Sequence, residues 1–199
     1  MMTETVLWRR IDVPGHEVGS LKPHDDGWEL FGTAVFAHEY GPCNLDYVVI
    51  CDSGWRTESA RISGVIADRE INLRVSVNRE SKWSLNGVEC PTVAGCVDID
   101  LGFSPSTNLL PIRRLSLSHG QEAKVRAAWL PFPSLEFELL EQTYRREGDS
   151  LYRYESGGGL FIRLLEVNSV GFVINYPGLW VEEGNLNVRG SRGAEGALL

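Results

Sequence analysis

Hydrophobic and polar residues alternate along most of this chain with a period of two. Ile71, Leu73, Val75 and Val77, for example, are separated by single polar residues. A strand places successive side chains on opposite faces of its sheet, so this alternation predicts strands with one buried and one solvated face. The same pattern recurs at 28–36, 97–103, 123–129 and 135–139. The chain is therefore expected to be mostly β.

Turn residues separate these segments. Asn86-Gly87 lies between two short runs, KWSL and VEC, and predicts a two-residue hairpin, because both central positions of that turn need a positive φ. Further turns are expected at Gly41-Pro42, Gly157–Gly159 and Pro177-Gly178.

Strands and turns follow one another from residue 5 to about residue 190 with no shift in composition. We therefore expect one domain over residues 1–199, a length that suits a single domain with its own core. The glycine-rich end, 190–199, is expected to be a frayed tail.

One segment, Ser104–Leu115, departs from the period of two and predicts the single helix. It begins with Ser, Pro, Thr and Asn residues that suit a helix start, and Pro111 lies in an early turn where a missing N–H is tolerated. Leu109, Leu110 and Ile112 then cluster on one side. A second helix-like segment, 121–129, alternates small and apolar residues and is interpreted as a strand.

Composition and charge narrow the classes of function. Hydrophobic residues make up 43% of the chain, as in a typical globular domain, and the net charge is -8. That charge argues against broad binding to nucleic acid or anionic membranes. The apolar runs are too short for an integral membrane segment, and the start lacks a secretory signal pattern. A cytoplasmic location is therefore expected.

The four cysteines, Cys43, Cys51, Cys90 and Cys96, are expected to be reduced in that compartment. Their spacing differs from the close pairs that zinc modules use, so buried structural cysteine is the favoured interpretation. The sequence predicts no metal and no cofactor.

Two carboxylates carry the first candidate chemistry. Asp98 and Asp100 lie on the same face of a predicted strand, with Cα atoms about 7 Å apart. Paired carboxylates resemble the acid and base of a glycosidase. The competing interpretation is a solvated strand face whose aspartates pair with Arg113 and Arg114 for structural reasons.

Polar residues on the predicted helix form the second group of candidate functional residues. Asn108, Arg113 and Arg114 belong to an element otherwise made of leucine, isoleucine and proline. An apolar lining with a few placed polar groups is typical of a binding pocket, although helix capping and an internal salt bridge explain the residues equally well.

Aromatic residues form the third group of candidate functional residues. Most of the six tryptophans are expected in the core. Trp55, Trp83 and Trp180 each lie beside turn residues and are therefore the ones expected to line an opening. No histidine forms a recognisable catalytic pattern, and His119 is the one histidine that would merit a test.

The chain resembles a known family, the glycolipid-binding proteins, formerly a domain of unknown function. The longest shared block is GCVDIDLGFSPSTNLLPIRRL, residues 95–115. Shorter motifs in the same order are Gly27-Trp28-x-Leu30-x-Gly32, Pro42-x-x-Leu45-x-Tyr47-x-Val49, Cys51-Asp52-x-x-Trp55-x-Thr57, Trp83-x-x-Asn86-Gly87, Tyr152-x-Tyr154 and Tyr176-Pro177-x-x-Trp180.

The resemblance implies a spiral β-roll, in which a long antiparallel sheet wraps around a single α-helix, here Thr107–Leu115. It also implies a homodimer and a shape similar to that of bacterial lipoprotein carriers. A glycolipid ligand follows from this analogy of fold alone.

Three hypotheses follow. The favoured one is a non-catalytic binding or carrier protein for an amphipathic ligand, a glycolipid or lipid-like molecule. The alternatives are a hydrolase acting on a sugar or ester through Asp98 and Asp100, and a structural or dimerisation module. The predicted ligand-binding residues are Trp55, Trp83, Asp98, Asp100, Asn108, Arg113, Arg114 and Trp180.

Overall fold

The computed structural model describes residues 3–184, so the predicted tail at 190–199 lies outside the described residues. Within them, the strands form one continuous sheet. The strands of its first half are β1 Glu4–Arg10, β2 Gly15–His24, β3 Gly27–His38, β4 Gly41–Cys51, β5 Thr57–Ile66, β6 Arg69–Val77, β7 Trp83–Leu85 and β8 Val88–Glu89. Those of the second half are β9 Asp98–Leu101, β10 Glu122–Leu130, β11 Glu138–Arg146, β12 Leu151–Ser156, β13 Phe161–Val167, β14 Val173–Tyr176 and β15 Trp180–Glu182.

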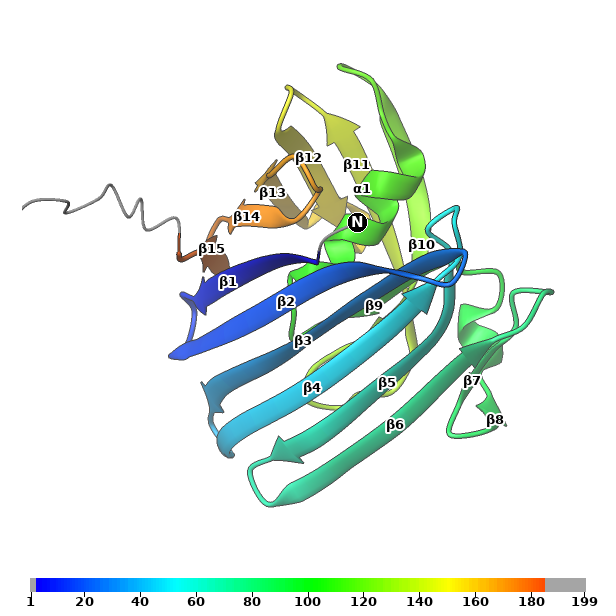
Figure 1. Ribbon diagram of the computed structural model, residues 1–199, viewed down its shortest axis with the longest axis vertical. Coiled ribbons are helices and arrows are strands. Elements are labelled where there is room, and N and C mark those ends of the chain that lie inside the picture. The colour runs from blue at the N-terminus through cyan, green and yellow to red at the C-terminus, as the bar shows by residue number, and fades with distance from the viewer. Residues whose placement is uncertain (1–2, 185–199) are drawn as a thin grey trace, which may run out of the picture.

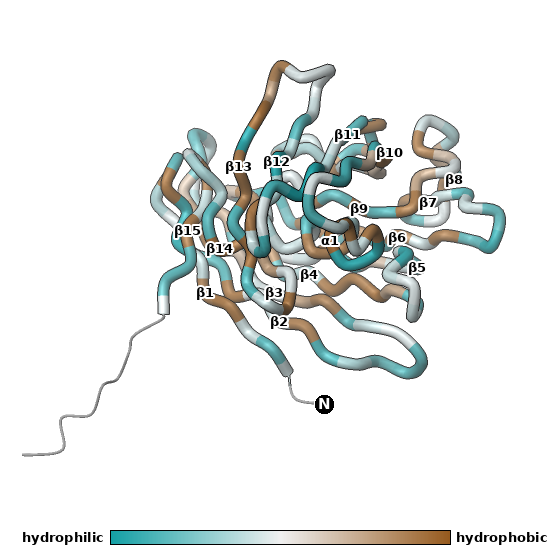
Figure 2. The backbone as a smooth tube through the Cα atoms, turned by 90° about the horizontal axis from the view of Figure 1, so that it is seen from above, coloured by the Kyte–Doolittle hydropathy of each residue, from teal (hydrophilic) through white to brown (hydrophobic). Residues whose placement is uncertain are grey.

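The sheet follows the chain order within each half, and the halves meet where β1 pairs with β15. Every pairing is antiparallel except the one between β9 and β10. The edges are β8 and β9, so the sheet stays open. Figures 1 and 2 show β1–β6 as a broad twisted layer, β10–β15 curling over it, and the helix α1 (Leu109–Leu115) between them. The predicted roll around one helix is confirmed.

The alternation of the sequence explains which face is buried. In β4, Cys43, Leu45, Tyr47, Val49 and Cys51 all point inward and are at most 1% exposed. Their partners in β3 and β5 follow the same parity, and the inner face of the sheet forms the core. Burial of each large side chain stabilises the fold by about 1.5–3 kcal/mol.

A glycine provides space for one of these side chains. A Cβ atom at Gly32 would lie 2.4 Å from the hydroxyl oxygen of Tyr47, which is closer than any real contact. Without that Cβ, the Tyr47 hydroxyl passes across β3 and reaches Glu17 on β2.

The helix is short and mostly buried. Leu109, Leu110 and Ile112 are at most 5% exposed, and the helix ends where Ser116 adopts a left-handed φ of 44°. A 3₁₀ turn, Ser106–Asn108, precedes it, so the α-helix begins two residues later than Thr107. Asn108 occupies the cap position without a side-chain capping bond, because its side chain bonds elsewhere.

Three of the four predicted turns are confirmed, including Pro177-Gly178, whereas Gly41 and Pro42 are the first residues of β4 and the turn before them is formed by Glu39 and Tyr40. Asn86 and Gly87 have φ values of 51° and 81° and join β7 to β8 as a two-residue hairpin. The glycine-rich segment Gly157–Gly159 joins β12 to β13, and the segment 121–129 lies in β10, a strand as interpreted.

Two strands have bounds in the structure that differ from those predicted from the sequence. The alternation at 135–139 is wrong as a strand before Glu138, because Leu135 lies in a turn with a φ of 55° and its N–H donates to the Pro131 carbonyl at 2.8 Å. The alternation at 97–103 gives only β9, and both of its faces are buried. The helices among residues 3–184 are too short and insufficiently apolar to span a membrane.

Candidate ligand-binding site

Arg114 and Asp98 join the helix to the sheet. The Arg114 Nε donates to Asp98 Oδ1 at 3.1 Å, and its Nη2 donates to Asp98 Oδ2, so the pair is bidentate. Asp98 is 1% exposed, which corrects the interpretation of a solvated strand face. Burial raises the pKa of Asp98, and the hydrogen bond and charge of Arg114 oppose that rise. The expected pairing of arginine with this strand is confirmed for Arg114.

Asp100 has no arginine partner among residues 3–184. Its Oδ2 accepts a hydrogen bond at 2.6 Å from Nε2 of Gln142 on β11. The same Nε2 donates to the hydroxyl oxygen of Tyr154 at 3.0 Å. Burial raises the pKa of Asp100 to about 6, the charge of Asp98 adds to the rise, and the Gln142 hydrogen bond opposes it. Asp100 Oδ1 forms no hydrogen bond within the described part of the chain.

Asp100 faces a cavity of about 400 Å³ inside the curl of the second half of the sheet. We call it the inner cavity. Each of the strands β9–β15 contributes to its lining, and the residues between strands that complete it are Gly102, Ser104, Asn108, Gly157 and Leu179. The lining residues on the strands include Asp100, Leu101, Trp129, Leu140, Tyr154, Ser156, Phe161, Tyr176 and Trp180.

Aromatic rings form one wall of the inner cavity. Tyr154, Phe161 and Tyr176 pack edge to face or tilted, with ring centroids 6.0–6.2 Å apart. Trp180, which is 5% exposed, continues this wall, and the guanidinium of Arg10 lies 5.3 Å from its ring centroid. An apolar aromatic lining with few polar groups is typical of sites for small organic ligands.

Asn108 lines the inner cavity, but its amide is largely engaged. Its Oδ1 accepts from the Tyr144 hydroxyl at 2.9 Å, and its Nδ2 donates to the Pro105 carbonyl at 3.1 Å. Asn108 therefore fixes the start of the helix against β11, and one amide hydrogen is left for a ligand.

The structure separates the predicted site residues. Asp100, Asn108 and Trp180 meet at the inner cavity, whereas Trp55 and Arg113 line a different cavity at the C-terminal end of α1.

The expectation that Trp83 lines an opening is wrong. Its side chain is 0% exposed, its Nε1 donates to the Cys96 carbonyl at 3.0 Å, and its ring packs edge to face on Phe137. The turn near Trp83, Asn86-Gly87, lies at the edge of the sheet, but β7 directs the Trp83 indole toward the core.

Sequence reasoning missed several residues of the inner cavity. Tyr154 and Phe161 come from β12 and β13, and the pattern of a single strand does not show which strands lie beside one another in the sheet. Glu17 was also missed: its Oε1 accepts from Tyr47 at 2.7 Å and from Ser104 at 2.5 Å, and Ser104 lines the cavity. The Pro-x-x-Leu-x-Tyr motif contained Tyr47 but gave no sign of its carboxylate partner.

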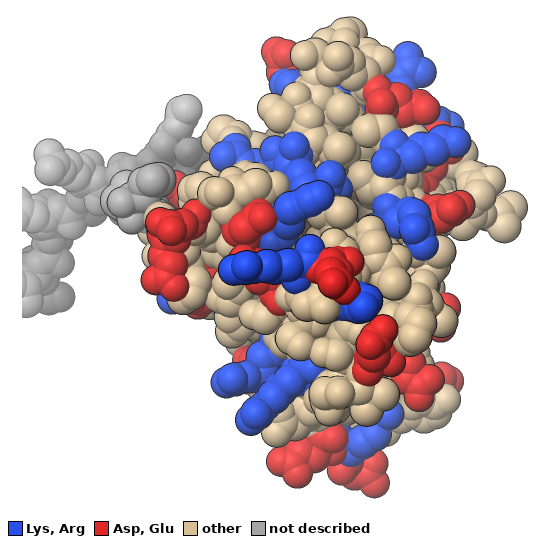
Figure 3. Space-filling model, turned by 90° about the vertical axis from the view of Figure 1, so that its right-hand side faces the viewer, with Lys and Arg blue, Asp and Glu red and all other residues tan. Residues whose placement is uncertain are grey.

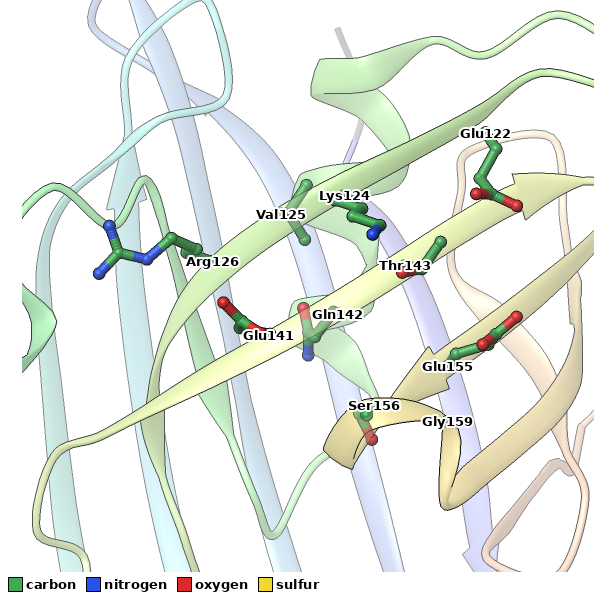
Figure 4. Close-up of a pocket in the computed structure, with 11 residues that line it drawn as sticks. Glu122, Lys124, Val125, Arg126, Glu141, Gln142, Thr143, Glu155, Ser156 and Gly159 are labelled. Carbon is green, nitrogen blue, oxygen red and sulfur yellow. The ribbon is translucent and has the colours of Figure 1, made fainter.

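A larger hollow of about 660 Å³ lies on the outer face of β10–β12. Figure 4 shows its charged and polar side chains arising from these strands, with Glu141 and Thr143 from β11 and Lys124 from β10. Its lining has three glutamates, one lysine and one arginine and no aromatic ring, so it does not suit an amphipathic ligand. Figure 3 shows acidic and basic groups interspersed over one face of the molecule.

Within residues 3–184, no three side chains of the metal-ligating types lie close enough to hold an ion. Cys43, Cys51 and Cys96 are buried, Cys90 is half-buried, and all four are free thiols. Burial raises the pKa of Cys51 to about 12, as expected for an unreactive core thiol.

Comparison with known proteins gives the family. A family model described as "Putative glycolipid-binding" matches residues 5–182. The chain belongs to this family. The crystal structure of a DUF1089 family protein from Pseudomonas aeruginosa is similar, with 34% sequence identity and a TM-score of 0.73 over 82% of this chain and 90% of that chain. A search of curated proteins found no match.

Proposed function

We propose that this protein is a non-catalytic binding or carrier protein for an amphipathic ligand, a glycolipid or lipid-like molecule, and that the inner cavity holds it. The observation that carries the proposal is the combination of an aromatic wall with one carboxylate, Asp100, that lacks a cationic partner in the described residues. The description of the family supports the same class of ligand.

The chemistry of the cavity favours a neutral head that carries hydroxyl groups. A sugar hydroxyl can donate to the Oδ1 of Asp100, and a sugar ring can stack through its C–H groups on Trp180 or Tyr176. A phosphate or carboxylate head would instead be repelled by the Asp100 charge at neutral pH, because the lining that the described residues form holds no cation to offset it. The apolar part of the ligand would lie against Leu140 and Phe161.

The hydrolase hypothesis needs both Asp98 and Asp100 as catalytic groups, and Asp98 is not available for this role. Both oxygens of Asp98 accept hydrogen bonds from Arg114, and the inner cavity is lined by Asp100 but not by Asp98. A mechanism with an acid and a base at these two positions would need Asp98 to leave that pair, at the cost of a buried, unpaired charge.

The first experiment is to find what the purified protein carries. Native mass spectrometry, followed by extraction and analysis of lipids, should detect a bound amphiphile with a sugar head. A thermal-shift panel of alkyl glycosides and fatty acids should give larger shifts with the glycosides. The absence of both a co-purified ligand and any glycoside shift would refute the proposal.

A matched pair of variants tests the role of the carboxylate. Asp100→Asn should weaken alkyl glycoside binding about tenfold, which corresponds to the loss of one charge-assisted hydrogen bond. Asp68→Asn removes the same charge from the turn between β5 and β6 and should leave binding unchanged. Equal affinities for the two variants would remove Asp100 from the site.

We also propose that the protein forms a homodimer through the outer face of β1–β3. Leu7, Val18 and Val35 are 38%, 44% and 52% exposed there, and Leu7 lies opposite Val18 in the register. Exposed apolar clusters of this kind support association. Light scattering after size exclusion should give a dimer for the parent protein and a monomer for Val18→Glu; a monomeric parent protein would contradict the proposal.

We further propose a cytoplasmic location, which the four free thiols support because cytosolic reductants keep cysteines reduced. Fractionation of cells combined with thiol labelling tests this. Recovery of an oxidised form from an extracytoplasmic fraction would contradict it.

A further inference from the structure

We propose that the cavity between Trp55 and the C-terminal end of α1 is a second binding site, for a small oxyanion such as a phosphate or carboxylate group. This cavity has a volume of about 420 Å³. Its polar and aromatic lining includes Trp55, Arg113, Ser116, Arg146, Asn168 and Ser169. The site shares no lining residue with the inner cavity, so it is distinct from the site of the proposed amphiphile.

Arg113 is held in position without an acidic partner. Its guanidinium carbon lies 5.0 Å from the ring centroid of Trp55. On the other side, its stem packs on Gly171, where an added Cβ would lie 3.1 Å from the Arg113 Cδ. No residue in the range 3–184 accepts a hydrogen bond from this guanidinium. Its planar donors are therefore ordered in advance and available for the oxygens of an anion.

Trp55 adopts an unfavourable backbone conformation at this position. Its φ is 66°, a region that bulky residues rarely occupy. The loop enforces the conformation, because Asp52 Oδ1 accepts hydrogen bonds from the backbone N–H groups of Gly54 and Arg56 at 2.8 and 2.9 Å. The Trp55 ring then stacks on Trp28 with centroids 4.6 Å apart. Strained residues fixed by their surroundings occur preferentially at functional sites.

Asn168 offers a second oriented donor. Its Oδ1 accepts hydrogen bonds from the backbone N–H groups of Val170, Gly171 and Phe172 at 3.0–3.1 Å. This arrangement fixes the orientation of the amide and leaves its Nδ2 donors without an acceptor in the described chain. The hydroxyl groups of Ser116 and Ser169 border the same space.

The charge of the lining also suits an anion. Two arginines, Arg113 and Arg146, face one carboxylate, Asp149, so the lining has a net charge of +1 on a chain whose net charge is -8. Arg146 donates to the carbonyls of Leu117, Gly148 and Asp149 and therefore contributes charge rather than free donors. Arg113 and Asn168 are left to make the direct contacts.

The test is a titration with inorganic phosphate and with acetate, followed by the indole N–H resonance of Trp55, with sodium chloride of matched ionic strength as the reference. The parent protein should show a saturable shift with one or both anions and none with chloride. Arg113→Gln should weaken binding at least tenfold. The matched control Arg61→Gln, which removes an exposed arginine from the outer face of β5, should bind as the parent does. Shifts that fail to saturate, or equal affinities in the two variants, would overturn the proposal.

Further variants sharpen the result. Asp149→Asn removes the carboxylate of the lining and should strengthen phosphate binding several-fold, whereas an unchanged affinity would contradict the electrostatic account. Leu140→Trp fills the inner cavity and should leave phosphate binding unchanged. This difference separates a failure of the anion site from a failure of the amphiphile site.

The source of the anion is resolved by a second arm. Vesicles of phosphatidylcholine with phosphatidic acid should co-sediment the parent protein but not Arg113→Gln if the phosphate belongs to a lipid head. Saturable binding of inorganic phosphate without co-sedimentation would assign the site to a free anion. The proposal is refuted if the parent protein neither co-sediments with the vesicles nor binds inorganic phosphate saturably.

Discussion

Asp98 and Asp100 lie two residues apart on β9, but only Asp98 is paired with an arginine. The bidentate bond from Arg114 takes both oxygens of Asp98, whereas Asp100 receives one bond from Gln142 and borders the inner cavity. The structural interpretation of the two carboxylates therefore applies to Asp98, and the ligand-binding interpretation is the one we propose for Asp100.

The two arginines of α1 should differ sharply in their contribution to stability. Arg114→Met leaves the buried charge of Asp98 unpaired and should lower the free energy of unfolding by about 3 kcal/mol at pH 7. Arg113→Met removes an exposed side chain without an acidic partner in the described residues, and the loss of its contact with the Trp55 ring should lower the free energy of unfolding by no more than about 1 kcal/mol. Urea denaturation of both variants measures the difference, and similar values for the two would contradict the assigned roles.

Asp100→Asn should stabilise the fold while it weakens ligand binding. The pKa of Asp100 in the folded protein is about 6, above its ordinary value of 3.8. The stability that the protonated carboxyl contributes is therefore fully present below about pH 4 and is lost as the pH rises through 6. The variant has no charge to bury and should gain about 1–3 kcal/mol at pH 8. Thermal unfolding at pH 4 and pH 8 tests this, and an equal effect at both values would disprove it.

Glu17→Gln should reduce the pH dependence of stability near neutrality. Burial raises the pKa of Glu17 to about 7, and its Oε2 is buried without a partner among residues 3–184. Ionisation of Glu17 therefore costs stability as the pH rises from 5 through 7, on the order of 3 kcal/mol in total. The amide oxygen of the variant keeps an acceptor for Tyr47 and Ser104. Denaturation from pH 5 to 8 should show a flatter profile for the variant, and parallel profiles would argue against this assignment.

The cysteines should react unequally with a thiol reagent. Cys90 is half-buried and should react first, whereas burial protects Cys43, Cys51 and Cys96 and raises the pKa of each thiol. Titration with a chromogenic disulfide should give one fast thiol in the native protein and four in urea. Two or more fast thiols in the native protein would contradict the burial described above.

Most of the fold could be predicted from local patterns. Alternation predicted the strands at 28–36 and 71–77, and Asn86-Gly87 predicted the hairpin, because both signals depend on the backbone and side chains of neighbouring residues. The segment at 135–139 was predicted wrongly because its alternation outweighed the turn residues Pro131, Pro133 and Ser134 just before it. The turn they form extends to Leu135, whose N–H donates to the Pro131 carbonyl.

The site was harder to predict because its geometry depends on long-range pairing. Three of the residues singled out from the sequence, Asp100, Asn108 and Trp180, meet although they come from β9, the turn before α1 and β15. The sequence groups Arg113 with them because it lies on the same predicted helix as Asn108. The direction of each side chain around α1 sends Arg114 to Asp98 and Arg113 to Trp55, and that direction is fixed by contacts distant in sequence.

The most direct test of the central claim is calorimetric titration of octyl glucoside into the parent protein and into Leu140→Trp. Leu140 lines the inner cavity, and a tryptophan there should fill the space meant for the ligand. We expect saturable binding to the parent protein and at least a tenfold loss of affinity in the variant, with an unchanged circular dichroism spectrum. Equal affinity in the two proteins would place the ligand elsewhere and contradict the account.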